Sequence, residues 1–269
     1  MSPHPIVSPA TLDAVRKISA EAGAEILKIY ESAFSVEVKD DRTPLTEADL
    51  AAHRTIVAGL TQLSPEIPIL SEESADIPFA ERATWATYWL VDPLDGTREF
   101  IKRNGEFTVN IALINKTKVE MGVIWVPVTG VCYSAAVGLG AHKAEPGKAS
   151  RSISVRPRPT DITVVAGSRS HGSEATQKFV ENLGRTEMTA IGSSLKSCLV
   201  AEGTVDIYPR FGLTSEWDTA AAQGIVEQAG GLVTGIDLEP LRYNTKESLL
   251  NPDFLVFGDQ NVDWRQYIS

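Results

Sequence analysis

The sequence predicts a mixed α+β / α/β fold in two parts, and three observations indicate this class. Apolar residues recur at helical spacing near the N-terminus, β-rich runs follow between residues 107 and 134, and short strands alternate with helices from residue 162 onward. With 269 residues, the chain is long enough for about two domains and for a sizeable buried core. We therefore expect a helix-flanked antiparallel sheet followed by an α/β unit.

Two helices are expected near the N-terminus. Ser8 and Pro9 are typical of an N-cap and a first helical residue, and apolar residues recur at helical spacing over 12–29. A second helix is predicted to begin at Thr46, after the polar stretch 39–43, which is typical of a loop. Residues 46–49 resemble a capping box with Asp in place of Glu, which by itself explains Asp49 as a structural residue.

Strand-like segments follow these helices. The short apolar segments 67–70 and 89–91 each run directly into acidic residues, so carboxylates are expected at strand ends. The β-rich runs 107–114 and 119–126 are separated by four polar residues and predict an antiparallel hairpin, with 131–134 as a third strand.

A domain junction is expected within 138–159, because this segment is rich in Gly, Pro, Lys and Arg and shows no periodicity. We assign residues 1–145 to an N-terminal α+β metal-binding domain and residues 146–269 to a C-terminal α/β domain. In the second domain, helices are predicted to alternate with strands. The strands are 162–166, 188–191, 205–208, 232–234 and 254–257, and the helices are 173–183, 194–201 and 216–229.

Charge and cysteine content exclude several classes of protein. The chain carries 25 Lys and Arg against 35 Asp and Glu, a net charge of −10, which disfavours binding to nucleic acid polymers. The only two cysteines, Cys132 and Cys198, are too few for a disulfide framework and are expected to be buried thiols. No signal peptide and no transmembrane segment is predicted, so we expect a cytoplasmic monomer or homodimer. Peripheral attachment to the inner face of the cell membrane is left open.

The run from Asp92 to Thr97 carries the strongest chemical signal. It directly follows an apolar strand, Pro93 fixes its backbone, and Gly96 permits a tight turn, so the carboxylates of Asp92 and Asp95 can converge. Hard divalent cations such as Mg²⁺ prefer oxygen ligands of this kind. Asp-Pro and Asp-Gly are also common turn dipeptides, but both together at the end of a buried strand favour a metal site.

Further acidic residues leave two interpretations open. Glu72 or Glu73 could complete the same cation cage, or the two could form a solvated acidic loop. Asp218 lies in the first turn of a predicted helix, where it could be a ligand or could only interact with the helix dipole.

Four short segments occur in a characteristic order along the chain, namely Glu72-Glu73, Asp92 to Thr97, Trp217-Asp218 with the alanines that follow, and 229–231. Together, these segments resemble the lithium-sensitive, magnesium-dependent phosphomonoesterase superfamily of inositol monophosphatase. More narrowly, the runs 94–101, 104–112, 168–171 and 192–196 resemble the bacterial 3′(2′),5′-bisphosphate nucleotidases. The likeness covers nearly the whole chain and implies a layered αβαβα sandwich of the inositol monophosphatase type, the sugar phosphatase fold.

The resemblance also implies roles for individual residues. It implies that two or three Mg²⁺ ions are held by the carboxylates of Glu72, Asp92, Asp95 and Asp218 and by the Leu94 carbonyl. The backbone N–H groups of Gly96 and Thr97 would bind the phosphate, as expected where a turn enters a helix. Asp49 would orient the Thr97 hydroxyl, and Thr97 with Glu72 would align the attacking water. The implied substrate-binding residues are Gly96, Thr97, Ser168, His171, Gly192, Lys196 and Asp218, with Lys196 as the partner of a second phosphate.

Considered without the resemblance, His171 would be interpreted as a surface histidine and Lys196 as an exposed helix lysine. Arg210, after Tyr208-Pro209, is a further candidate for contact with phosphate. Glu73 is expected near the metals but not as a direct ligand.

The function implied by the resemblance is hydrolysis of adenosine 3′,5′-bisphosphate (PAP) to AMP and phosphate in sulfur assimilation. The related 5′-phosphosulfate (PAPS) is a second expected substrate. A metal-activated water would attack the 3′-phosphate in line, without a covalent intermediate. The alternatives are an inositol monophosphatase, a fructose-1,6-bisphosphatase, or a non-catalytic sensor of metal or nucleotide. The presence of both Asp49 and Thr97 argues against the sensor.

Overall fold

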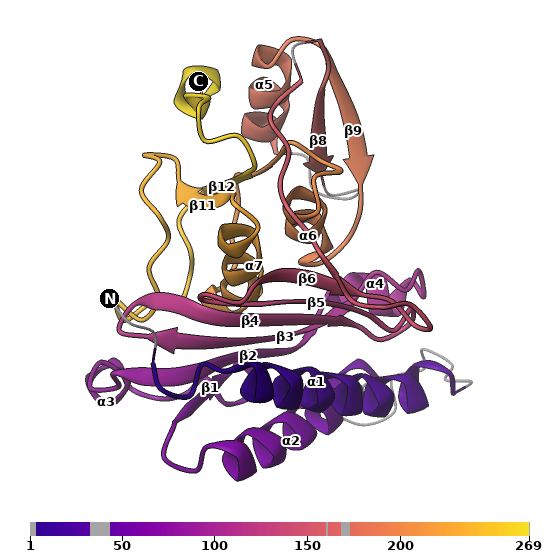
Figure 1. The fold of residues 1–269 in the computed structure, drawn as a ribbon, viewed down its shortest axis with the longest axis vertical. Helices are drawn as coiled ribbons and strands as arrows, with labels where there is room; N and C mark the ends of the chain where they lie inside the picture. The colour runs from indigo at the N-terminus through magenta and orange to yellow at the C-terminus, as the bar shows by residue number, and fades with distance from the viewer. Residues whose placement is uncertain (1–3, 33–43, 160, 168–172, 269) are drawn as a thin grey trace.

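The computed structural model describes residues 4–32, 44–159, 161–167 and 173–268, which form five stacked layers (Figure 1). Two long helices cover one face of a first sheet, two shorter helices lie between this sheet and a second one, and a further helix covers the outer face of the second sheet. This αβαβα order is the predicted fold class. None of the helices in these ranges is long and apolar enough to cross a membrane.

The first layer contains α1 (Pro9–Tyr30) and α2 (Pro44–Leu63). Helix α1 begins as predicted, because the Ser8 hydroxyl accepts a 3.1 Å hydrogen bond from the backbone N–H of Thr11. Helix α2 begins two residues before the predicted start, at Pro44, a residue whose missing N–H is not needed in the first turn. Thr46 therefore lies inside the helix, and the capping-box interpretation of 46–49 is wrong. The predicted loop 39–43 lies outside the described residues.

The first sheet has the order β1-β2-β3-β4-β5-β6-β7. Its strands are β1 (Ile69–Ser71), β2 (Thr87–Asp95), β3 (Thr108–Asn115), β4 (Lys118–Val126), β5 (Val131–Ala136), β6 (Gly140–Ala144) and β7 (Arg151–Ser152). Strand β1 pairs with β2 in parallel, and the other neighbours are antiparallel, so the predicted hairpin of β3 and β4 is confirmed. Side chains alternate across the sheet: on β2, Trp89 and Val91 pack toward α1 and α2, whereas Tyr88 and Leu90 face the middle layer.

The predicted junction segment 138–159 contains β6 and β7, which continue the first sheet. These two strands were not predicted, because strands of five and two residues are too short to give a periodic pattern. The division of the chain into domains near residue 145 stays a prediction.

The second sheet has the order β11-β12-β10-β8-β9. The elements of this half are β8 (Thr163–Gly167), α5 (Glu174–Asn182), β9 (Thr186–Ala190), α6 (Leu195–Ala201), β10 (Ile207–Arg210), α7 (Glu216–Gln228), β11 (Leu232–Gly235) and β12 (Phe254–Phe257). Each lies within two residues of its prediction. Strands β9, β8 and β10 are parallel, and β12 runs antiparallel to both β10 and β11.

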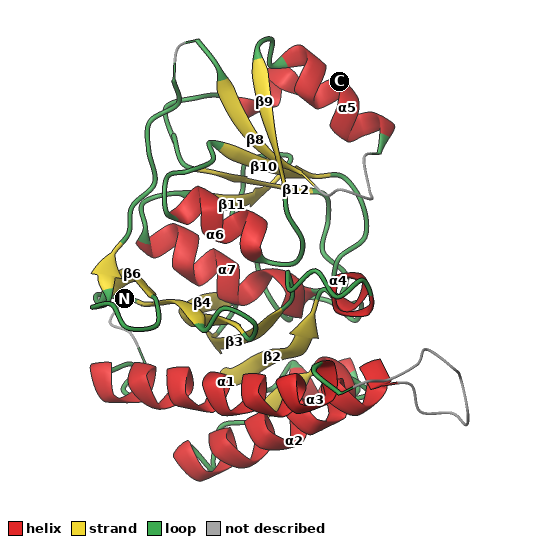
Figure 2. Ribbon diagram, turned by 90° about the vertical axis from the view of Figure 1, so that its right-hand side faces the viewer, coloured by secondary structure: helices red, strands yellow, loops and turns green. Residues whose placement is uncertain are grey.

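Helices α6 and α7 form the middle layer between the two sheets (Figure 2). Helix α7 packs so closely on β4 that a Cβ atom at Gly122 would overlap the Ala221 carbonyl, which explains a glycine inside this strand. Helix α5 and the short 3-10 helix η2 (Trp264–Tyr267) cover the outer face of the second sheet. Both cysteines are buried, as predicted.

Among the described residues, three short elements lie in the connections of the first half, and only the helix after Gly96 was expected from the sequence. They are the 3-10 helix η1 (Glu72–Ser74) and the helices α3 (Phe79–Arg82) and α4 (Thr97–Ile101). Elements η1 and α4 directly follow β1 and β2, two parallel neighbours whose carboxyl ends lie at the same edge of the sheet. This edge carries the acidic residues of the sequence motifs.

Candidate active site

Three aspartates converge where the end of β2 meets the start of α7. Asp92 and Asp95 lie on the last residues of β2, and Asp218 lies in the first turn of α7. One carboxylate oxygen of each lies within 4.8 Å of one oxygen of each of the others. The sequence motif and the helix start, which are more than 120 residues apart, thus form one acidic cluster.

Each of these three carboxylates has one oxygen held by a backbone N–H group. Leu94 N donates to Asp92 Oδ1 (3.0 Å), Ser194 N to Asp95 Oδ2 (2.6 Å), and Ser215 N to Asp218 Oδ2 (2.7 Å). The last of these bonds belongs to a capping box of α7, so Asp218 both caps its helix and faces the cluster. A carboxylate has two oxygens, and with one fixed in this way the other can serve as a metal ligand.

The electrostatics of the cluster fit a divalent cation. Burial first, and then repulsion by neighbouring carboxylates, raises the pKa of Asp92 well above its ordinary value. The same two causes, in the same order, raise the pKa of Asp218 to about 7. Buried carboxylates that repel each other are stabilised by a bound cation, and a site built from oxygen atoms alone suits Mg²⁺ better than softer metals.

Glu72 and Asp49 extend the acidic cluster. Glu72 follows β1, and its pKa is raised first by burial, while a hydrogen bond with Asp92 acts in the opposite direction. Asp49 on α2 is buried, and its Oδ1 atom has no hydrogen-bond partner among the residues that the structure describes. Burial, followed by the charges of Glu73 and Glu72, raises the pKa of Asp49 to about 8. Glu72 as a whole is exposed, but its carboxyl group interacts with Asp92, and its role as a metal ligand stays a prediction.

The turn after Asp95 is tight and leads directly into helix α4. Gly96 has a φ of 98° and precedes Thr97, the first residue of α4. A Cβ atom at position 96 would approach the Glu106 carbonyl to 3.1 Å in a conformation that L-residues rarely adopt, so glycine is required here. Leu94 is buried within the same strand end.

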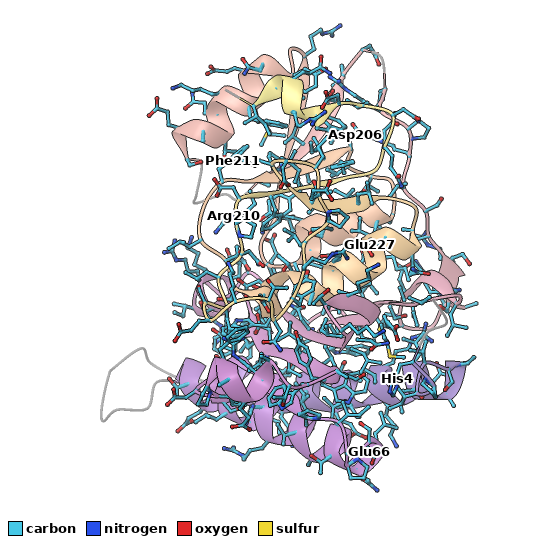
Figure 3. The ribbon with its side chains drawn as sticks, turned by 90° about the vertical axis from the view of Figure 1, so that its left-hand side faces the viewer. His4, Glu66, Asp206, Arg210, Phe211 and Glu227 are labelled. Carbon is cyan, nitrogen blue, oxygen red and sulfur yellow. The ribbon has the colours of Figure 1, made fainter. Side chains whose placement is uncertain are left out.

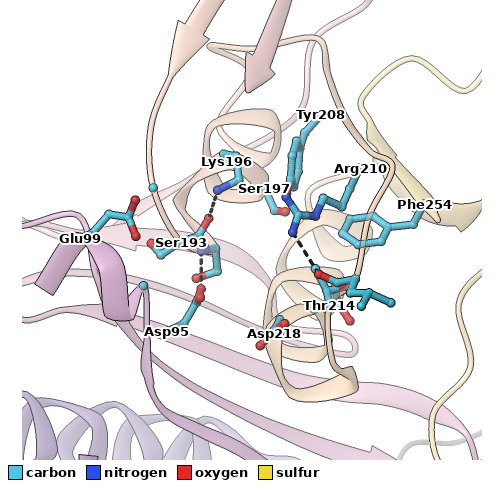
Figure 4. Close-up of a pocket in the computed structure, with 15 residues that line it drawn as sticks. Asp95, Glu99, Ser193, Lys196, Ser197, Tyr208, Arg210, Thr214, Asp218 and Phe254 are labelled. Carbon is cyan, nitrogen blue, oxygen red and sulfur yellow. Dashed lines mark hydrogen bonds between the residues drawn. The ribbon is translucent and has the colours of Figure 1, made fainter. Parts of the chain in front are cut away.

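A cavity next to the cluster carries positive charge on its opposite wall (Figure 4). Asp95 and Asp218 line one side, and Lys196 and Arg210 line the other. Lys196 is only 7% exposed, so its interpretation as an exposed helix lysine is wrong. Its Nζ atom donates to the Ser193 carbonyl at 2.7 Å and lies 5.3 Å from the ring centroid of Tyr208. Burial lowers the pKa of Lys196, and the charge of Asp95 acts in the opposite direction.

Arg210 is the last residue of β10 and lines this cavity. Asp206 lies just before the first residue of the strand, on the far side from the cavity (Figure 3). Arg210 Nη2 donates to the Leu213 carbonyl at 3.0 Å. Its Nε atom is buried and has no hydrogen-bond partner within the described ranges. A buried guanidinium N–H without a partner is suited to an anionic ligand.

The loop 191–194 connects the two walls of the cavity. Gly192 N donates to Glu106 Oε2 at 2.9 Å, and a Cβ atom at Gly192 would overlap the side chain of Glu99. Gly192 also lines the cavity, and its assignment as a nucleotide contact stays a prediction. Ser168 and His171 lie outside the described residues, so their assignment as nucleotide contacts stays a prediction.

Sequence reasoning missed the polar residues that support this loop. Thr108 and Asn110 on β3, together with Ser194, form buried hydrogen bonds beside Asp95. The available signal was the presence of two polar residues within the apolar run 107–114.

Comparison with known proteins identifies relatives along almost the whole chain. The model of the inositol monophosphatase family matches residues 10–260. The 3′(2′),5′-bisphosphate nucleotidase CysQ of Escherichia coli strain K12 is 48% identical over 248 residues, which cover 91% of this chain and 98% of that protein. The protein of the same name from Haemophilus influenzae is 40% identical and covers 94% of this chain and 95% of its own length.

Solved structures agree with this result. CysQ from Bacteroides thetaiotaomicron, a bacterial member of the inositol monophosphatase family, superimposes with a TM-score of 0.84 at 42% identity, covering 93% of this chain and 98% of that chain. An inositol monophosphatase from Zymomonas mobilis has a TM-score of 0.78 at 22% identity, covering 97% and 98% of the two chains. The second likeness shows a shared fold.

Proposed function

This chain belongs to the inositol monophosphatase family, and on that premise we propose that it is a 3′(2′),5′-bisphosphate nucleotidase that hydrolyses PAP to AMP and phosphate. The Escherichia coli and Haemophilus influenzae proteins that are named for this activity are 40–49% identical to this chain. The matches cover at least 91% of this chain. The reaction class is therefore hydrolysis of a phosphoric monoester.

The choice of a bisphosphate as the substrate rests on the charges of the side chains that line the cavity. A wall of carboxylates, with Asp95 and Asp218, faces a wall with two cationic side chains, Lys196 and Arg210. A substrate with two phosphates can place one at each wall, with the scissile phosphate at the acidic cluster and the second at Lys196 and Arg210. A simple monoester leaves the second wall without a partner.

The acidic cluster is proposed to hold two or three Mg²⁺ ions through Glu72, Asp92, Asp95, Asp218 and the Leu94 carbonyl. When bound, such ions lower the pKa of a coordinated water and neutralise charge on the phosphoryl oxygens. The fit rests on the all-oxygen ligand set and on the raised pKa values of its carboxylates.

The remaining roles belong to groups around the cluster. Backbone N–H groups of Gly96 and Thr97 would bind the scissile phosphate at the start of α4. The buried Oδ1 of Asp49 has no partner in the described chain, and it would accept a hydrogen bond from the Thr97 hydroxyl when the site is filled. Thr97 and Glu72 would then orient the attacking water. Ser168, His171 and Gly192 complete the proposed nucleotide site.

Hydrolysis of PAPS, a place in sulfur assimilation, a cytoplasmic location and a monomeric or dimeric state stay predictions. None is needed for the reaction proposed above.

The test is phosphate release from PAP, inositol 1-phosphate and fructose 1,6-bisphosphate, measured side by side with Mg²⁺ and with a chelator. We expect PAP to have the highest kcat/KM and the chelator to abolish release. A preference for inositol 1-phosphate or fructose 1,6-bisphosphate would replace this assignment by the corresponding sugar phosphatase. Binding of PAP and Mg²⁺ without any release would identify a sensor.

A further inference from the structure

A series of hydrogen bonds between buried polar side chains leads to Asp95. Thr108 and Asn110 lie on β3, Ser194 directly precedes α6, and all three are at most 5% exposed. The hydroxyls of Thr108 and Ser194 are 2.8 Å apart, and Ser194 Oγ lies 3.0 Å from Asn110 Oδ1. Asn110 Nδ2 lies 3.5 Å from Asp95 Oδ2. The three contacts form a continuous path from the interior of the first sheet to the acidic cluster.

The direction of each hydrogen bond follows from the groups involved. The side-chain carbonyl of Asn110 can only accept, so the Ser194 hydroxyl donates to it. That hydroxyl has one hydrogen, and the Thr108 hydroxyl must therefore donate to Ser194 Oγ. With the Asn110 carbonyl held by Ser194, its amide N–H faces Asp95. The orientation of this amide is thus set by its neighbours.

An asparagine is unexpected at this position of the strand. Asn110 shares its face of β3 with Ala112 and Ile114, which pack into the core of the middle layer. Burying an amide without hydrogen bonds costs about 1–3 kcal/mol in proteins, so such a residue is tolerated only where its bonds are made. At position 110 both bonds lead to functional segments, namely the end of β2 and the start of α6.

Asp95 is therefore held differently from the other two aspartates of the cluster. The backbone donors to Asp92 and Asp218 lie two and three residues away in the sequence. Oδ2 of Asp95 instead receives the N–H of Ser194, from the other half of the chain, and lies next to Asn110. The loop that supplies Ser194 also supplies the Ser193 carbonyl that holds Lys196.

We propose that Asn110 is a positioning residue that fixes the Asp95 carboxylate and the Ser194 loop in one arrangement, so that the cation site and the second-phosphate site are set together. This inference rests on the proposed function only in taking Asp95 as a metal ligand and Lys196 as a phosphate contact. Asn110 itself touches neither ligand.

The test compares Asn110→Leu with Thr108→Val. Both replace a buried polar residue of β3 by an apolar one of similar shape, and both remove a bond to Ser194, but only the first removes the contact with Asp95. Binding of Mn²⁺ to each protein without nucleotide is measured by electron paramagnetic resonance of the free ion, and KM for PAP is measured in parallel. Groups that orient metal ligands change metal affinity by about 10- to 100-fold, and we expect a loss in this range for Asn110→Leu. We also expect its KM for PAP to rise, and we expect Thr108→Val to lose less than Asn110→Leu in both measurements.

Equal Mn²⁺ affinities in the wild type and Asn110→Leu would overturn the proposal. Equal losses in both variants would also overturn it, because the effect would then belong to the polar cluster as a whole. If Asn110→Leu does not fold, Asn110→Ser decides the question with the same outcomes, since serine keeps a polar group but is too short to reach Asp95. A wild-type protein that binds Mn²⁺ but does not hydrolyse PAP would refute the proposed function and leave the test of Asn110 intact.

Discussion

The backbone N–H of Ser194 donates a 2.6 Å hydrogen bond to Oδ2 of Asp95, and this bond joins the second half of the chain to the acidic motif of the first. Asp95 ends β2 of the first sheet, whereas Ser194 follows β9 of the second. The active-site cavity lies at this contact, with one wall from each half. In the proposed reaction, cation binding and recognition of the second phosphate would therefore depend on the same junction.

Replacing Asp95 by asparagine tests the cation site. We expect Asp95→Asn to lower kcat for PAP by about 1,000-fold, roughly 4 kcal/mol of transition-state stabilisation, because a charged metal ligand is lost. The new amide oxygen can still accept the Ser194 N–H, so the fold should persist. The melting temperature measures whether the fold persists, and phosphate release from PAP measures the loss of kcat. As a control, Asp161→Asn changes an exposed aspartate in the same way and should leave both unchanged. Near-normal turnover by Asp95→Asn would refute the metal assignment.

Replacing Lys196 by methionine tests the second-phosphate site. A hydrogen bond to a charged group contributes about 1.5–3 kcal/mol, so Lys196→Met should lower kcat/KM for PAP by about 10- to 100-fold. For 3′-AMP, which has no second phosphate, we expect a change of less than about threefold on the same grounds. The control is Lys178→Met on α5, where the exposed lysine pairs with Glu174 away from the active-site cavity. Equal losses with both substrates would contradict the proposed role of Lys196.

Metal and pH should act together on stability. In the metal-free protein the pKa values of Asp218 and Asp49 are raised from 3.8 to about 7 and about 8. The stabilisation from their protonated forms is therefore complete below about pH 4 and is lost as the pH rises through 7 and 8. A bound cation neutralises the ionised carboxylates, so the increase in melting temperature caused by Mg²⁺ should grow between about pH 5 and pH 8. Thermal unfolding with Mg²⁺ and with a chelator at both pH values measures this, and an increase that falls with pH would contradict it.

Local signals in the sequence were sufficient for much of this structure. Each α-helix of the second half ends two residues before a glycine with positive φ, namely Gly184 (84°), Gly203 (74°) and Gly230 (95°), a conformation that does not continue a helix. The start of α2 was misplaced because Thr46 has the side chain of a good cap, whereas the helix already begins at Pro44. Caps can be recognised from composition, but the choice between two possible starts depends on packing.

Some features of the candidate site could likewise be predicted from local sequence, whereas others depend on the tertiary fold. The pair Asp92 and Asp95 could be identified because its spacing and the preceding strand are local features. The burial of Lys196 could not be predicted from its seven-residue helix, since it results from Tyr208 on β10 and from the loop 191–194. The role of Asn110 depends on Ser194, which is 84 residues away and enters the site only through the tertiary fold.

Glu216 provides a pH effect that is separate from the metal. It is 1% exposed in the first turn of α7, its Oε2 accepts the Asn244 N–H at 2.8 Å, and its Oε1 has no hydrogen-bond partner in the described ranges. Burial raises the pKa of Glu216 from 4.5 to about 7, while the Asn244 N–H and the charge of Arg82 act in the opposite direction. Its contribution to stability is therefore present below about pH 4.5 and is lost as the pH rises through 7.

Glu216→Gln keeps the shape of the side chain and removes its ionisation. We expect the variant to gain up to about 3 kcal/mol of unfolding free energy relative to the wild type between about pH 5 and pH 8.5, because only the wild type must bury a charge at the higher pH. Urea unfolding with saturating Mg²⁺, which keeps the acidic cluster neutralised, measures this difference. Glu66→Gln, at an exposed glutamate before β1 (Figure 3), is the matched control and should parallel the wild type at both pH values. A Glu216→Gln profile parallel to that of the wild type would mean that Glu216 stays ionised in the folded protein, with Arg82 and Asn244 compensating for its burial.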